Sequence, residues 1–164
     1  MSATGLDVFD RTLQTTNVWL REIMADTAAD RQLAWKILSV VLHKLRDHLP
    51  VELAAHLGSQ LPLLVRGVYY DLYQPARQPI HCASFDMFVE EVAECLSDTR
   101  PTDPRLAIRA VFATLSRHVT PGQIDNVRAA LPQSLRSAWE AAGDSRAASL
   151  ARSEPDERQP PRSP

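Results

Sequence analysis

Glycine and an excess of charge of one sign are both scarce in this sequence. The 164 residues contain five glycines, and neither a G-x-G-x-x-G nor a G-x-x-x-x-G-K-[ST] motif occurs. Glycine backbone in such motifs approaches phosphates closely, so the common nucleotide-binding enzymes are not expected. Lys and Arg together number 18 and Asp and Glu 20, which gives a net charge of −2. This balance supplies no overall attraction to nucleic acid or to an anionic membrane.

Long apolar runs and paired cysteines are also lacking. Charged residues interrupt every apolar stretch well short of the ~20 residues that cross a bilayer. The start of the chain has no basic patch followed by an apolar stretch, as a secretory signal would. Cys82 and Cys95 are not spaced as C-x-x-C, and a lone pair is not a disulfide framework. We therefore expect a soluble cytoplasmic protein with reduced thiols.

Apolar residues recur every three or four positions through most of the chain, and no segment alternates as a strand would, which predicts an all-α fold. The first such stripe, in a helix near the N-terminus, consists of Val8, Phe9, Leu13, Leu20, Ile23 and Met24. Leu-Pro corners at 61–62 and 131–132 and a capping serine at Ser84 mark boundaries of later helices. The segment 120–123, Thr-Pro-Gly-Gln, predicts a capping box in which the glutamine reaches back to the threonine.

The helical pattern repeats at a constant offset of 70 residues. Two stripes correspond in this way: Leu38, Val41, Leu42, Leu45 and Leu49 fall on Ile108, Val111, Phe112, Leu115 and Val119. The first helix of each half aligns at an offset about two residues larger. We predict two four-helix repeats, about 6–70 and 84–141, joined by a linker at 71–83 and sharing one core in a single domain, 6–141. The polar, proline-rich residues 143–164 predict a disordered tail.

Four segments of the chain carry a resemblance to a known family. Residues 9–14, 41–50, 60–70 and 111–136 resemble the bacterial domain of unknown function 2267. The resemblance extends over about Leu6 to Trp139. It implies an all-helical fold with a duplicated unit, and it implies no activity, cofactor or catalytic residue.

Histidines are the most obvious candidates for chemistry. His43 and Asp47 lie one helical turn apart and could share a metal ion, but no ligand signature accompanies them, so a solvated helix face is preferred and no metal is expected. His48 and His118 are equivalent in the repeat, each near the end of its helix. We expect each imidazole to bond the free carbonyls at its own helix end, a cap, in preference to a pH sensor or a general base.

Two arginines are also paired by the repeat. Arg66 and Arg136 each follow a Leu-Pro corner by four residues. Each could grip a carboxylate or a phosphate, or could anchor its helix to an acidic residue of a neighbouring helix. We favour the anchor.

The tyrosine segment at 69–73 has no counterpart in the second half. Its three rings could form a recognition surface or could pin the crossing between the repeats to the core. Helical spacing predicts that Tyr69 is buried and that Tyr70 is more exposed. His81 and Cys82 are adjacent, so their side chains diverge in an extended chain and do not form a catalytic dyad. A partner or ligand surface, if present, is expected at Arg66, Tyr70, Tyr73 and His81.

No motif for catalysis, for a cofactor or for nucleic acid stands out. The sequence therefore favours a non-enzymatic helical module that acts through protein contacts, with self-association as one form. The alternative is a small-molecule-binding protein or an unrecognised enzyme with a pocket between the repeats, near the tyrosine segment. Nucleic-acid binding would need a basic face, and Lys36, Lys44, Arg46 and Arg66 are too dispersed to provide one.

Overall fold

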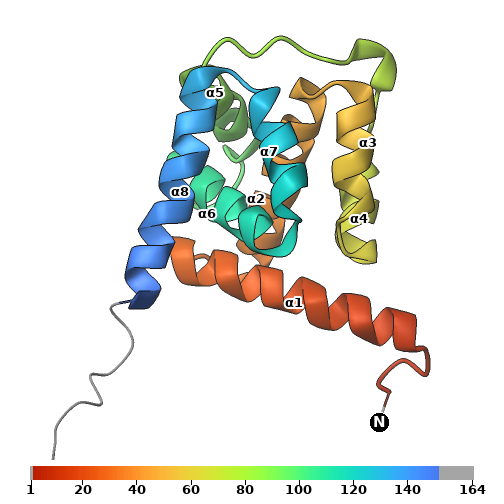
Figure 1. Cartoon of the computed structure of the whole chain (residues 1–164). Helices are drawn as coiled ribbons and strands as arrows, with labels where there is room; N and C mark the ends of the chain where they lie inside the picture. Colours follow the sequence, from red (N-terminus) through yellow and green to blue (C-terminus); the bar gives the residue numbers. More distant parts are fainter. Residues whose placement is uncertain (1, 152–164) are drawn as a thin grey trace, which may run out of the picture.

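The computed structural model describes residues 2–151, with the side chains of residues 2–144, and all of its regular structure is helical (Figure 1). The prediction of an all-α fold is confirmed for this part of the chain. The elements in order are α1 (Asp7–Thr27), α2 (Arg31–His48), α3 (Val51–Ser59), α4 (Leu63–Tyr70), the short 3-10 helix η1 (Pro75–Arg77), α5 (Phe85–Cys95), α6 (Pro104–His118), α7 (Pro121–Ala129) and α8 (Gln133–Ala151).

Two helices, α2 and α6, form the centre of the bundle. They contact each other, and α1 runs across one end of the bundle against both of them (Figure 1). The remaining long helix, α8, packs along α6. In Figure 1 the linker crosses the opposite end of the bundle from α4 to α5. The N-terminal half of α1 extends beyond the central pair, beneath α4.

Polar caps explain where several helices begin. The side chain of Asp30 accepts the N–H of Leu33 at the start of α2 (2.8 Å), and Ser84 accepts that of Met87 at the start of α5 (3.2 Å). Each cap satisfies one of the amides that the first helical turn leaves without a carbonyl partner. The predicted role of Ser84 is confirmed.

The predicted capping box at the start of α7 is wrong. The side chain of Thr120 makes no capping bond to its own helix. Instead, Gln60 Nε2 donates to Thr120 Oγ1 (3.1 Å), and the N–H of Thr120 donates to Gln60 Oε1 (2.9 Å). Gln123 is buried and does not reach back. A glutamine 60 residues away in the sequence therefore replaces the local cap, which no local pattern could indicate.

The core is one continuous hydrophobic cluster that extends from Trp19 to Ala142. Both predicted stripes of α2 and α6 are buried in it, and Leu45 and Leu115 are each fully buried. The ring of Phe112 stacks on that of Trp139, with centroids 4.1 Å apart. Buried aliphatic and aromatic side chains of this kind supply most of the free energy that stabilises such a fold.

The buried stripes of α1 and α5 match at a different offset from the one expected. Thr16, Trp19, Leu20 and Ile23 of α1 correspond in burial to Phe85, Phe88, Val89 and Val92 of α5, an offset of 69 residues in place of about 72. The duplication itself stays a prediction.

The last helix is longer than the sequence predicts. Backbone of α8 is helical through Ala151, so the first part of the predicted tail, 143–164, continues this helix. The rest of the predicted tail, 152–164, lies outside the described residues.

Candidate interaction site

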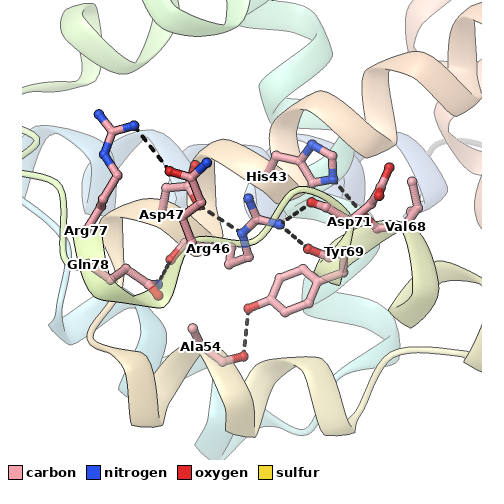
Figure 2. A network of polar contacts seen from close by, with 10 residues as sticks. His43, Arg46, Asp47, Ala54, Val68, Tyr69, Asp71, Arg77 and Gln78 are labelled. Carbon is pink, nitrogen blue, oxygen red and sulfur yellow. Dashed lines mark hydrogen bonds and ion pairs between the residues drawn. The ribbon is translucent and has the colours of Figure 1, made fainter.

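A buried arginine organises the tyrosine segment (Figure 2). Arg46 is only 2% exposed, and its Nη1 donates to the carbonyls of Tyr69 (2.5 Å) and Asp71 (2.9 Å) at the end of α4. Its Nε pairs with Asp47 (2.8 Å). The last carbonyls of a helix lack intrahelical donors, and a guanidinium can serve two of them at once. Arg46 therefore fixes the point where α4 ends and the linker begins.

The three tyrosines make contacts within the molecule. Tyr69 is buried as predicted, and its hydroxyl donates to the carbonyl of Ala54 (2.7 Å). Burial raises the pKa of this hydroxyl. The half-buried ring of Tyr70 packs edge-on against Tyr69, and that of Tyr73 lies 4.9 Å from the Arg46 guanidinium carbon. These contacts agree with the interpretation that the tyrosines fix the crossing between the two halves of the chain to the core.

Arg66 and Arg136 anchor the Leu-Pro corners, but not to acidic residues as predicted. Arg66 Nη2 donates to the carbonyls of Ser59 and Leu61 (2.9 Å each), and Arg136 Nη2 donates to that of Leu131 (3.1 Å). Carbonyls at the ends of α3 and α7 have no helical donors. They accept the arginine hydrogen bonds that were expected to go to a carboxylate.

The four predicted surface residues are not gathered into one site. Tyr70 and Tyr73 meet, with ring centroids 5.7 Å apart. Arg66 serves its own corner, and His81 is exposed in the linker. Among the described residues no polar or ring contact joins either of them to the tyrosine pair. The polar hollow beside the linker is small, about 180 Å³, and is lined by Asp47, Leu72, Gln74, Arg77, Gln78 and Ile80.

His48 and His118 do not cap their own helices, contrary to the prediction. His48 is buried, and its Nδ1 bonds the carbonyl of Ile80 (2.8 Å) while its Nε2 bonds Glu91 of α5 (2.7 Å). The Nε2 of His118 bonds Glu22 of α1 (3.1 Å). Each histidine thus connects the second helix of one half to the first helix of the other. The His43 ring is also engaged, through Nε2 to the carbonyl of Val68 (2.5 Å). Within the described residues no three metal-ligating side chains gather.

An exposed apolar surface on α1 and α4 is the main feature that the sequence analysis missed. Six of the eleven large hydrophobic side chains that are exposed in the described part lie here: Leu6, Val8, Phe9, Leu13, Leu63 and Leu64. Val8, Phe9 and Leu13 belong to the apolar stripe predicted for the first helix, and in the structure the N-terminal half of this stripe is exposed. A large apolar cluster on a surface usually marks an interaction site. Periodicity showed that this face of α1 is apolar, but it could not show that the stripe is longer than the core it faces.

A groove follows this surface where α1, α2 and α4 meet. Its volume is about 410 Å³, and its apolar walls come from Leu13, Leu20, Trp35 and Leu64. The N–H of Leu64 donates to Thr12 Oγ1 (2.9 Å), which ties the start of α4 to α1 and closes one side of the groove. Arg31 stands at its rim, paired with Asn17.

These features define a helical bundle in which buried side chains such as Arg46 and His48 connect the helices. An apolar surface on α1 and α4 is exposed to solvent. None of its helices, over the residues described, combines the length and hydrophobicity needed to cross a bilayer. The chain belongs to the family described as "Uncharacterized conserved protein (DUF2267)", whose model matches residues 16–138. No curated protein matches the chain.

Proposed function

We propose that the protein is a non-enzymatic module that acts through protein contacts, and that it associates with a second copy of itself through the exposed surface of α1 and α4. The observation that carries this proposal is the clustering of exposed hydrophobic side chains around Phe9, Leu13 and Leu64. Burying such side chains against a partner removes apolar area from water, which favours association by about 25 cal/mol per Å² before the costs of binding.

The charges on α1 suit an antiparallel partner copy. Asp10, Leu13, Asn17 and Arg21 recur at helical spacing, so they share a face. A hydrogen bond from Ser2, with others from Thr4, lowers the pKa of Asp10, and an aspartate is charged at neutral pH even at its ordinary pKa. In an antiparallel pair of α1 helices that cross between positions 13 and 17, Asp10 of one copy lies opposite Arg21 of the other. Such complementarity fixes orientation.

Sedimentation velocity on the full chain tests this proposal. We expect a dimer for the wild type, and loss of the dimer when Phe9→Ser and Leu13→Ser are combined. Leu106→Ser is the matched control, because Leu106 on α6 is 41% exposed and Leu13 is 43% exposed. A wild-type protein that stays monomeric up to about 100 μM, or a control that dissociates as fully as the double variant, contradicts the proposal.

A ligand pocket near the tyrosine segment has less support. The hollow there, about 180 Å³, is below the ~300 Å³ at which small-molecule sites usually begin. Its neighbours Arg46 and Tyr73 are occupied with each other. We therefore favour protein contact over small-molecule chemistry.

A reducing, cytoplasmic setting agrees with the thiols. Cys82 and Cys95 are both free, and burial raises the pKa of Cys82, which disfavours its reactive thiolate. We include this location in the proposal.

A further inference from the structure

A second hollow lies on the other side of the Thr12 and Leu64 contact, and it shares Val8 and Leu63 with the exposed surface of α1 and α4. It measures about 290 Å³ and is bounded by α1, the corner between α3 and α4, and the end of α6. Its walls include the exposed apolar residues Val8 and Leu63, together with Trp19, Gln60 and His118.

The surroundings of His118 match those of His48 closely. The His118 ring stacks on Trp19, with centroids 5.2 Å apart, and the His48 ring packs on Phe88 at 5.8 Å. The Nε2 of each histidine bonds a glutamate that lies three residues after its aromatic neighbour. Glu22 follows Trp19 in α1, and Glu91 follows Phe88 in α5. Both imidazoles therefore have an aromatic neighbour and a carboxylate at Nε2, although His118 is stacked on Trp19 and His48 is tilted against Phe88.

The two histidines differ in the hydrogen-bond partner of their Nδ1 atom. At His48, the linker contacts the ring, and Ile80 is held at both ends: its carbonyl bonds Nδ1 (2.8 Å) and its N–H donates to the carbonyl of Asp47 (2.8 Å). At His118, Nδ1 has no hydrogen-bond partner within residues 2–144. The linker therefore occupies a position next to His48 Nδ1, and the corresponding position next to His118 Nδ1 has no peptide group bonded to it in residues 2–144.

The carbonyl that corresponds to that of Asp47 is also free of helical donors. This is the carbonyl of Arg117, the residue before His118. Pro121 has no N–H to offer it, and the N–H of Thr120 is used by Gln60. Arg117 and His118 are therefore consecutive residues at the end of α6 that carry a carbonyl without a helical donor and a ring nitrogen without a partner among residues 2–144, as Asp47 and His48 carry the two groups that bond Ile80.

The path of α1 explains why the position is open. In the second half the first helix begins at Phe85, and the chain before it bends onto His48. In the first half the helix already begins at Asp7, and its residues Arg11, Thr12 and Thr15 line the hollow together with His118. The helical start of α1 carries the chain away from the site that the linker fills in the other half.

We propose that the hollow at His118 binds an extended segment of a partner protein, as the linker is bound at His48. One apolar residue of that segment donates its N–H to the carbonyl of Arg117, and its carbonyl accepts a hydrogen bond from the Nδ1–H of His118. Its side chain lies against Val8 and Leu63. Backbone bonds of this kind provide affinity in peptide recognition, and the apolar pocket provides selectivity.

The linker's own sequence supplies a probe. An acetylated peptide of residues 79–83 with Cys82→Ser is titrated into the full-length protein, and the indole N–H signals are followed by NMR. We expect the signal of Trp19 to shift saturably, with a dissociation constant in the millimolar range, and that of Trp139, which bonds Ser116 elsewhere, to stay in place. The same peptide with Ile80→Pro lacks the required N–H, and it should not bind.

Two variants separate a binding role of His118 from a structural one. In His118→Asn the amide nitrogen replaces Nδ1 and the contact to Glu22 is lost, whereas His118→Gln keeps a nitrogen near Glu22 and loses Nδ1. We expect the Asn variant to retain peptide binding and the Gln variant to lose it by about tenfold, the effect of one hydrogen bond. The reverse order, equal affinities, binding of the Ile80→Pro peptide, or no shift of the Trp19 signal up to about 5 mM peptide would each overturn the proposal.

Discussion

Gln60 and Thr120 are joined by a pair of hydrogen bonds across the bundle. The Gln60 amide nitrogen donates to Thr120 Oγ1, and its oxygen accepts the N–H of Thr120, the residue that precedes α7. This pair fixes the corner after α3 against the start of α7, and these two helices also contact each other. The side chain of Gln60 thus caps a helix in the other half of the chain.

Removal of this pair should weaken the fold modestly. Gln60→Ala is expected to lower the free energy of unfolding by about 1 kcal/mol, because both bonds are partly open to water. Urea denaturation of the single variants and of Gln60→Ala with Thr120→Ala measures the coupling. If the two effects simply add, Gln60 Nε2 does not interact with the Thr120 hydroxyl, because Thr120→Ala removes that bond and keeps the backbone N–H that donates to Gln60 Oε1.

Arg46 should be among the most sensitive polar residues. Arg46→Met leaves the carbonyls of Tyr69 and Asp71 without donors in a buried place, so we expect a loss of about 3 kcal/mol in stability. Arg77 in the linker is exposed, and Arg77→Met serves as the control with a change within about 0.5 kcal/mol. Equal effects of the two substitutions in thermal or urea unfolding would contradict the organising role of Arg46.

Two glycines of the first half should respond to alanine with opposite signs. A Cβ at Gly58 would collide with the rings of Tyr70 and Tyr69, so Gly58→Ala should cost about 1–3 kcal/mol. Gly67 lies in α4 with no atom within 4 Å of such a Cβ, and Gly67→Ala should stabilise the protein by about 0.5–1 kcal/mol. Melting temperatures of the two variants on the same side of the wild type would show that Tyr70 is not packed on α3.

Alkaline pH should unfold the protein in part through Tyr69. Its pKa is raised in the folded state by burial, while in the unfolded chain it ionises near pH ~10. The stabilisation is therefore complete below the unfolded pKa and falls as pH rises above it. The slope of unfolding free energy against pH between about 9.5 and 11 should become shallower in Tyr69→Phe. An unchanged slope would mean that another group controls alkaline unfolding.

The sequence was a good guide wherever local spacing decides the structure. Helical periodicity located the buried faces of α2 and α6, and Ser84 and the two Leu-Pro corners marked boundaries that the structure retains. Spacing also separated buried Tyr69 from half-buried Tyr70. Each of these outcomes depends on neighbours within one or two helical turns.

Contacts between distant residues could not be predicted in the same way. His48 meets Glu91 and Ile80, and Thr120 meets Gln60, because packing brings separate helices together. Periodicity shows which face of a helix is apolar but not how much of that face the rest of the bundle covers. Phe9 and Leu13 continue the stripe of α1 past the end of the core, and they are exposed for that reason.

Exchange of charges on α1 is the most direct test of the central claim, which is antiparallel self-association through this helix. Asp10→Arg and Arg21→Asp are made singly and together, and the dimer dissociation constant is measured by sedimentation equilibrium. The two residues are too far apart on one helix to contact each other. We predict that each single variant weakens the dimer by about tenfold and that the double variant restores it. Additive weakening in the double variant, or no effect of either charge, would contradict the account.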